Sequence, residues 1–87
     1  MTFRILVTPK ALKQIAKFHE SARLRTERFL KETLDREDPR SLGRALVGES
    51  FWRYRVGDYR ILVSIDDDVL TVLIVSAEHR RSVYRDV

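Results

Sequence analysis

Three arginines, Arg53, Arg55 and Arg60, lie in one short stretch, FWRYRVGDYRILVSI, in which polar and apolar residues alternate. Alternation with a period of two is typical of a β-strand that has one buried and one solvated face. Gly57-Asp58 has the composition of a two-residue hairpin turn, which would pair Arg55 with Arg60 and Arg53 with Leu62. The three guanidinium groups would then share the open face of a sheet. Because like charges set opposite each other destabilise a sheet, we expect this face to bind an anion.

A cluster of guanidinium groups suits a phosphodiester, whose non-bridging oxygens gain negative charge as the ester is cleaved. The basic run Glu78-His79-Arg80-Arg81 follows the last predicted strand and should lie near the Arg60 end of the sheet. His79 could act there as an acid or base near neutral pH. Tyr84 could fold back to offer a phenol for hydrogen bonding and a ring for base stacking.

A structural alternative stays open for each of these residues. The arginines could be individually solvated or paired with carboxylates that are near in sequence, namely Glu49, Asp58, Glu78 and Asp86. His79 could be a structural or solvent-facing histidine.

The residue types argue against metal and thiol chemistry. The chain contains no cysteine, so it has no disulfide, thiolate nucleophile or cysteine-based zinc site. Asp66, Asp67 and Asp68 are adjacent on a predicted turn and would point in different directions, which favours a solvated turn over a metal site. We therefore expect no metal and no cofactor.

The overall composition predicts one folded domain, residues 1–87, with a basic surface. The net charge is +4, and every lysine lies at or before Lys31, so the later cationic side chains apart from histidine are all arginine. This balance favours nucleic acid or an acidic protein as a partner. No apolar run reaches the ~18 residues of a membrane span, and Pro9 interrupts the N-terminal apolar segment too early for a secretory signal. We expect a cytoplasmic protein.

The first half of the chain predicts a strand followed by two helices. Residues 2–7 alternate as a strand, and Thr8-Pro9 combines an N-cap hydroxyl with proline at the first helical position. Two apolar stripes at helical spacing follow, the second beginning after a cap at Ser21. Their members are Leu12, Ile15 and Ala16 in the first helix and Ala22, Leu24, Phe29, Leu30 and Leu34 in the second.

The second half predicts a β-meander. Strands are expected at residues 51–56, 59–65 and 69–76, with a short additional strand near 44–47. A turn at Asp67-Asp68 would pair Val63 with Val72 and Arg60 with Val75. The predicted class is α+β with the order β-α-α-β(3-4), two N-terminal helices packing on one face of a mainly antiparallel sheet. The side chains expected to meet the helices are Trp52, Tyr54, Val56, Tyr59, Ile61 and Val63.

Two segments, WRYRVGDYRI at residues 52–61 and EHRRSVYR at residues 78–85, together resemble the RelE branch of the RelE/ParE toxin superfamily. The strand–helix–helix–meander layout agrees over the whole chain. The resemblance implies a type II toxin that cleaves mRNA in the ribosomal A site without a metal. It also implies an acidic, RelB-like antitoxin as a partner in a toxin-antitoxin hetero-oligomer.

The resemblance also implies roles for individual residues. Arg60 looks like the family's transition-state arginine, Arg80 like the arginine that protonates or neutralises the leaving oxygen, and Tyr84 like the tyrosine that orients the scissile nucleotide. Arg53 and Arg55 stand where well-studied members have lysines, and would bind the phosphate. Arg81 would also bind the substrate and could exchange roles with Arg80.

The arginine substitutions leave the general base open. A lysine could take the 2′-hydroxyl proton, whereas an arginine ordinarily stays protonated. His79, Tyr84, or the RNA and ribosome themselves are the candidates. An alternative function from another class is a ParE-like inhibitor of DNA gyrase without nuclease activity.

Overall fold

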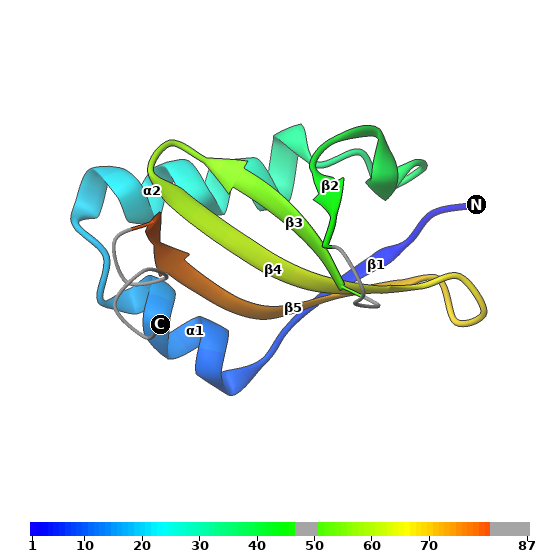
Figure 1. Ribbon diagram of the computed structural model, residues 1–87, viewed down its shortest axis with the longest axis horizontal. Helices are drawn as coiled ribbons and strands as arrows, with labels where there is room; N and C mark the ends of the chain where they lie inside the picture. The colour runs from blue at the N-terminus through cyan, green and yellow to red at the C-terminus, as the bar shows by residue number, and fades with distance from the viewer. Residues whose placement is uncertain (47–50, 81–87) are drawn as a thin grey trace.

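The computed structural model of the chain describes residues 1–46 and 51–80. The elements, in chain order, are β1 (Arg4–Val7), α1 (Pro9–Ala16), α2 (Glu20–Arg28), the π-helical turn η1 (Phe29–Thr33), the 3-10 turn η2 (Pro39–Ser41), β2 (Arg44–Ala45), β3 (Phe51–Val56), β4 (Tyr59–Asp66) and β5 (Thr71–His79). The strands form one sheet in the order β1-β5-β4-β3-β2. Strand β1 is parallel to β5, and the other neighbours are antiparallel (Figure 1). The predicted α+β class is confirmed.

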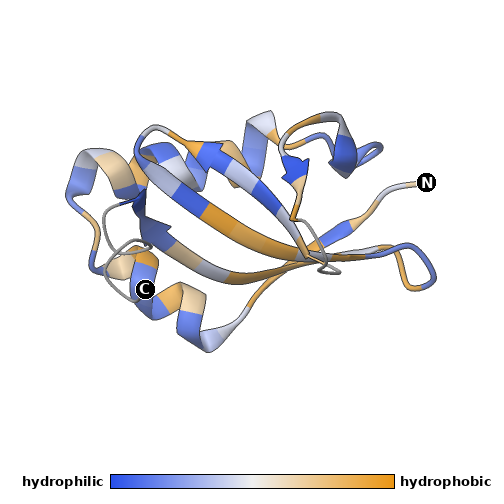
Figure 2. Cartoon of the chain, viewed as in Figure 1, coloured by the Kyte–Doolittle hydropathy of each residue, from blue (hydrophilic) through white to orange (hydrophobic). Residues whose placement is uncertain are grey.

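One hydrophobic core joins both helices to one face of the sheet. Its buried members are Phe3, Ala11, Ile15, Phe29, Leu34, Tyr54, Val56, Ile61, Val63, Val72, Ile74 and Ala77. Figure 2 shows the hydrophobic positions that run along β4 and β5. Of the side chains predicted to meet the helices, four are buried, and Trp52 and Tyr59 are half-buried. Within the described ranges, no helix is long and apolar enough to cross a bilayer.

The predicted register of the β3–β4 hairpin is confirmed. Arg55 pairs with Arg60 and Arg53 with Leu62 around the turn at Gly57-Asp58. Gly57 has a φ of +58°, a left-handed conformation that suits glycine in such turns. The hairpin therefore separates an apolar face from an arginine face.

The predicted register of β4 with β5 is wrong. Asp66 pairs with Thr71, so four residues rather than two connect the strands. The Asp66 carboxylate accepts hydrogen bonds from the backbone N–H groups of Asp68 and Val69, at 2.9 and 3.3 Å, and holds this wider loop. As a result, Arg60 pairs with Glu78 instead of Val75.

A β-bulge adds a second shift to the same pair of strands. Leu62 pairs with Ser76, but the next residue, Val63, pairs with Ile74, so Val75 is an extra residue on β5. Side chains alternate along a strand, and one extra residue exchanges the faces that they occupy. Beyond the bulge, Ala77 is therefore buried on the core side.

Helix α1 begins as predicted but buries a different stripe. The Thr8 hydroxyl accepts a hydrogen bond from the Ala11 N–H, and Pro9 occupies the first turn. Ala11 and Ile15 face the core, whereas Leu12 is 61% exposed. The small Ala11 side chain is fully buried, and the helix contacts β5 through this face.

Helix α2 starts at Glu20, slightly before the predicted cap at Ser21, and continues into η1. Phe29 and Leu34 are buried although they are five residues apart. The Leu34 N–H donates to the Phe29 carbonyl at 2.9 Å, which closes a π-helical turn. An α-helical period does not predict this spacing. Leu24, one of the expected core residues, is 47% exposed.

Helix α1 continues the edge of the sheet where β1 ends. Past Val7, the Thr8 hydroxyl donates to the Val75 carbonyl at 2.9 Å. The Ala77 N–H donates to the Gln14 side-chain oxygen at 2.9 Å. These side chains occupy backbone groups that a neighbouring strand would otherwise bind, and so they protect the edge of β5.

Tyr54 connects the centre of β3 to η2. Its side chain is fully buried, packs with its ring centroid 5.4 Å from that of Phe29, and donates a hydrogen bond to the Pro39 carbonyl at 2.6 Å. Burial disfavours the charged phenolate and raises the pKa of Tyr54 to about 12. The phenol therefore stays protonated at neutral pH.

We predict that Gln14→Ala lowers the free energy of unfolding by about 1–3 kcal/mol, because the buried Ala77 N–H loses its acceptor. Urea unfolding followed by circular dichroism measures this change. Lys13→Ala is the control, because Lys13 is exposed on the same helix. Equal stability of the two variants would contradict the role of Gln14 at the β5 edge.

We predict that Tyr54 makes the fold sensitive to alkaline pH. The pKa of Tyr54 is raised from its ordinary value of 10.0 to about 12 in the folded protein, so folding favours the protonated phenol. The contribution of Tyr54 to the free energy of unfolding is therefore complete below pH 10 and is lost as the pH rises from about 10 to 12. The loss should be on the order of 2 kcal/mol. Tyr54→Phe should be about 1 kcal/mol less stable at neutral pH but lack this alkaline component. Parallel curves of stability against pH for both proteins would refute the prediction.

Candidate functional site

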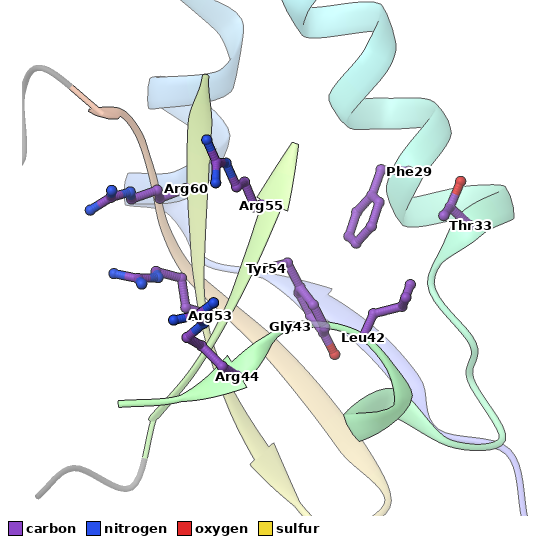
Figure 3. A pocket seen from close by; sticks show the side chains of 9 residues that line it. All are labelled: Phe29, Thr33, Leu42, Gly43, Arg44, Arg53, Tyr54, Arg55 and Arg60. Atoms are coloured by element: carbon purple, nitrogen blue, oxygen red, sulfur yellow. The ribbon is translucent and has the colours of Figure 1, made fainter. Parts of the chain in front are cut away.

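A pocket of about 580 Å³ lies beside β3 and contains most of the predicted arginines. We call it the arginine pocket. Its lining residues are Phe29, Thr33, Leu42, Gly43, Arg44, Arg53, Tyr54, Arg55 and Arg60 (Figure 3). None of these described lining residues is acidic, and the pocket therefore suits an anionic ligand.

Strand pairing brings the arginines of this pocket together. Arg44 on β2 is directly opposite Arg53 on β3, and Arg55 on β3 is directly opposite Arg60 on β4. Cβ atoms in such cross-strand pairs are about 5 Å apart. Figure 3 shows the four arginines on one side and Phe29, Thr33 and Leu42 on the other. The pocket thus combines a cationic wall with a wall that contains aromatic and aliphatic side chains.

Sequence reasoning missed Arg44, although it predicted a short strand in that region. A strand of two residues has too little alternation to reveal its register or its partner. Gly43 gives a local signal: its φ is +80°, and a Cβ atom there would lie only 2.3 Å from the Arg53 carbonyl oxygen. Trp52 Nε1 also donates to the Leu42 carbonyl at 2.6 Å. Because the backbone at Leu42 and Gly43 packs this closely against β3, the next residue, Arg44, lies beside the pocket.

A second, smaller pocket lies on the open face of the sheet and shares two of these arginines. Its volume is about 200 Å³, and we call it the open-face pocket. It is lined by Leu46, Arg53, Arg60, Leu62, Ser76 and Glu78. Among its described residues, Glu78 is the acidic one, and it is directly opposite Arg60 across β4 and β5. The carboxylate therefore lies at the border of the cationic cluster.

His79 does not line either of these pockets. It pairs with Tyr59, and the two rings meet edge to face with centroids 5.1 Å apart. Tyr59 in turn packs against Phe18 at 4.0 Å, which places His79 on the helix side of the sheet. The bulge in β5 explains the difference from the expected position in the basic corner, because it exchanges the faces of the residues that follow it.

Arg80 lies close to the turn of the arginine hairpin through its main chain. Its N–H donates to the Asp58 carbonyl at 2.8 Å, and its side chain is exposed. The expected positions of Arg81 and Tyr84 lie outside the described residues. The structure thus brings Arg53, Arg55 and Arg60 together and places the backbone of Arg80 beside them.

The site offers charge rather than a metal centre. Across residues 1–46 and 51–80, His, Asp and Glu side chains form no group of three that could hold a metal ion. Tyr54 lines the arginine pocket, but its raised pKa and its hydrogen bond to Pro39 keep it protonated. The arrangement can therefore bind and stabilise a phosphate group, whereas the lining of the arginine pocket provides no proton acceptor.

Several solved structures of toxins from toxin-antitoxin pairs have a fold similar to that of this chain. The RelBE2 toxin-antitoxin complex from Mycobacterium tuberculosis aligns with a TM-score of 0.82 and 27% identity, over 92% of this chain and 100% of that chain. The archaeal RelE-RelB complex from Pyrococcus horikoshii has a TM-score of 0.71 and 21% identity, over 92% and 97% of the two chains. A mutant of Escherichia coli RelE in the free state has a TM-score of 0.74 and 20% identity, over 98% and 93%.

At these identities, the archaeal and Escherichia coli proteins establish the shared fold alone. No curated protein sequence matches the chain significantly. Residues 5–84 match the family described as "ParE toxin of type II toxin-antitoxin system, parDE". The chain therefore belongs to this family of type II toxins, within the RelE/ParE superfamily, and has a RelE-like fold.

Proposed function

We propose that this toxin is an endoribonuclease that cleaves mRNA in the ribosomal A site. The observation that carries the proposal is the arginine pocket, in which Arg44, Arg53, Arg55 and Arg60 come from three neighbouring strands. Arginine forks match phosphate geometry and keep their charge at any working pH. The similarity to the toxin of the RelBE2 complex supports the same reading.

The proposed reaction is an attack of the 2′-oxygen on the adjacent phosphorus. The bond from phosphorus to the 5′-oxygen breaks, which leaves a 2′,3′-cyclic phosphate and a 5′-hydroxyl. Arg60 stabilises the charge that develops on the non-bridging oxygens, while Arg53 and Arg55 hold the phosphate. Arg80 neutralises the leaving oxygen.

Three further residues keep their predicted roles as proposals. Tyr84 stacks on and orients the nucleotide at the cleavage site, and Arg81 binds the substrate backbone. His79 is a weaker candidate for proton transfer, because its ring packs against Tyr59 on the helix side of the sheet.

We also propose an acidic, RelB-like antitoxin as the partner of this toxin. The solved complexes from Mycobacterium tuberculosis and Pyrococcus horikoshii pair toxins of this fold with antitoxins. The cationic face would attract an acidic chain, which would compete with RNA for the arginines. Such a hetero-oligomer would form in the cytoplasm, where translating ribosomes are found, and the toxin released from it would act there.

A second candidate function is inhibition of DNA gyrase, because the matched family is named for ParE toxins. The two functions make opposite predictions. If the toxin inhibits gyrase, the purified protein would block supercoiling and leave mRNA intact. If it is an endoribonuclease, it would leave supercoiling unchanged and produce new 5′ ends inside codons in a translating extract.

We predict that Arg60→Ala lowers ribosome-dependent cleavage by about 10²–10³-fold, because it removes one donor from the developing oxyanion. Mapping of 5′ ends on a translated message measures the loss. Tyr84→Phe should also cut less than the wild type, because the phenol is lost. Arg28→Ala is the control for charge, since Arg28 is exposed on α2 and outside the arginine pocket. Unimpaired cleavage by Arg60→Ala and Tyr84→Phe would count against the enzyme reading.

We predict that Arg44→Ala weakens binding to the programmed ribosome more than it slows the chemical step. Arg44 lines the arginine pocket from its edge strand and should contact an RNA phosphate. Loss of one such contact should reduce the slope of log affinity against log salt by about 1. Filter binding at several salt concentrations tests this, and an unchanged slope would remove Arg44 from the interface.

A further inference from the structure

The proposed cleavage needs a group that removes the proton of the attacking 2′-hydroxyl, and this inference rests on that proposed function. The four arginines of the arginine pocket cannot serve, because a guanidinium group stays protonated in proteins. Tyr54 is protonated, since its pKa is raised to about 12 and its hydroxyl donates to Pro39. His79 packs against Tyr59 on the helix side of the sheet. None of these described side chains is therefore suited to take the proton, and another described residue beside the arginines is needed for this role.

Glu78 is suitably placed on the open face of the sheet, where Arg53 and Arg60 also lie. It is the cross-strand neighbour of Arg60, and both residues line the open-face pocket with Arg53. Directly opposite residues have Cβ atoms about 5 Å apart, so a phosphate bound by Arg60 in the open-face pocket would lie on the same side of the sheet as the carboxylate. Glu78 is only half-buried and is accessible to a ligand in this pocket.

One oxygen of the Glu78 carboxylate is held in place by α1. Gln14 Nε2 donates to Glu78 Oε1 at 3.3 Å, while Gln14 Oε1 accepts from the Ala77 N–H at 2.9 Å. Gln14 is thus fixed at one end by the β5 backbone and orients Glu78 at the other. Within the part of the chain that the structure describes, no hydrogen bond to Glu78 Oε2 occurs. This second oxygen is available to accept a proton.

The bulge at Val75 determines that Glu78, rather than His79, shares a face with Arg60. Ile74 faces the core before the bulge, and simple alternation would turn residue 78 toward the core as well. With Val75 as an extra residue, Glu78 pairs with Arg60 and His79 with Tyr59. Bulges are common next to active sites, where they redirect a side chain. Thr8 holds this one by donating to the Val75 carbonyl at 2.9 Å.

We propose that Glu78 is the general base of this toxin. Its carboxylate takes the proton of the 2′-hydroxyl as the 2′-oxygen forms a bond to phosphorus. The bond between phosphorus and the 5′-oxygen breaks, and the 5′-oxygen takes a proton from water beside Arg80. Glu78 then returns its proton to solvent, so the enzyme ends in its starting state.

The competing explanation is that Glu78 only offsets the charge of the neighbouring arginines. The two roles differ in what Glu78→Gln does to each step. A general base contributes about 10²–10⁴-fold to the rate, so its loss should slow single-turnover cleavage on saturating ribosomes by that factor. A charge-balancing carboxylate would instead leave cleavage intact, and its loss would tighten RNA binding.

The decisive experiment combines Glu78→Gln with chemical rescue of Glu78→Ala. We expect both variants to bind programmed ribosomes within a few-fold of the wild type and to cleave slowly. Added formate should restore cleavage by Glu78→Ala in proportion to its concentration, while chloride at equal ionic strength should not. Glu37→Gln is the matched control, because Glu37 contacts the N-terminus and Thr2 outside both pockets.

Each outcome decides the proposal. Wild-type-like cleavage by Glu78→Gln, or slow cleavage by Glu78→Ala that formate does not restore, overturns the assignment of Glu78 while the endoribonuclease function stands. Absence of cleavage by the wild-type toxin on translating ribosomes overturns both. Slow cleavage with unchanged binding and formate rescue supports Glu78 as the base.

Discussion

The β3–β4 hairpin register is the constraint on which the rest of the molecule depends. It places Tyr54 and Ile61 in the core and pairs Arg55 with Arg60 on the opposite face. Because side chains alternate with a period of two, a slip of one residue would bury the arginines and expose the core. Gly57 protects this register through its positive φ, which other L-residues rarely adopt. One turn therefore determines both the stability of the core and the composition of the arginine pocket.

The same register imposes an electrostatic cost, and the fold accommodates it at the surface. Paired arginines repel each other, but Arg44 and Arg55 are exposed, and water screens most of their repulsion. The fully buried Tyr54 anchors the strand between Arg53 and Arg55. The sheet thus holds the arginines in place before any ligand binds, so a bound anion would meet guanidinium groups that are already positioned.

Sequence patterns were sufficient where the determinants are local. The β3–β4 register follows from one two-residue turn and an unbroken alternation, so the positions of Arg53, Arg55 and Arg60 could be predicted. The β4–β5 register could not, because the Asp66 carboxylate holds a wider loop and Val75 adds a bulge that no composition signal marks. The resemblance to RelE toxins indicated the family, but not how this chain turns its last strand.

Other parts of the site depend on contacts between distant segments. The π-helical turn buries both Phe29 and Leu34, a spacing of five residues that helical periodicity does not predict, and Phe29 lines the arginine pocket. Arg44 reaches the pocket because Gly43 crosses β3 at a distance that only glycine permits. In both cases, tertiary packing overrides a short and ambiguous local pattern.

The bulge at Val75 connects the architecture of the sheet with the chemistry proposed for it. Arginine in place of lysine gives a site permanent charge but removes a group that could exchange a proton near neutral pH. A site of this kind must therefore separate charge stabilisation from proton removal. One extra residue in β5 makes that separation possible, since it turns a carboxylate rather than an imidazole toward the face of the sheet that carries Arg60. Thr8 and Gln14 hold the bulge and the carboxylate from α1, so the helix that closes the edge of the sheet also orients the proposed base.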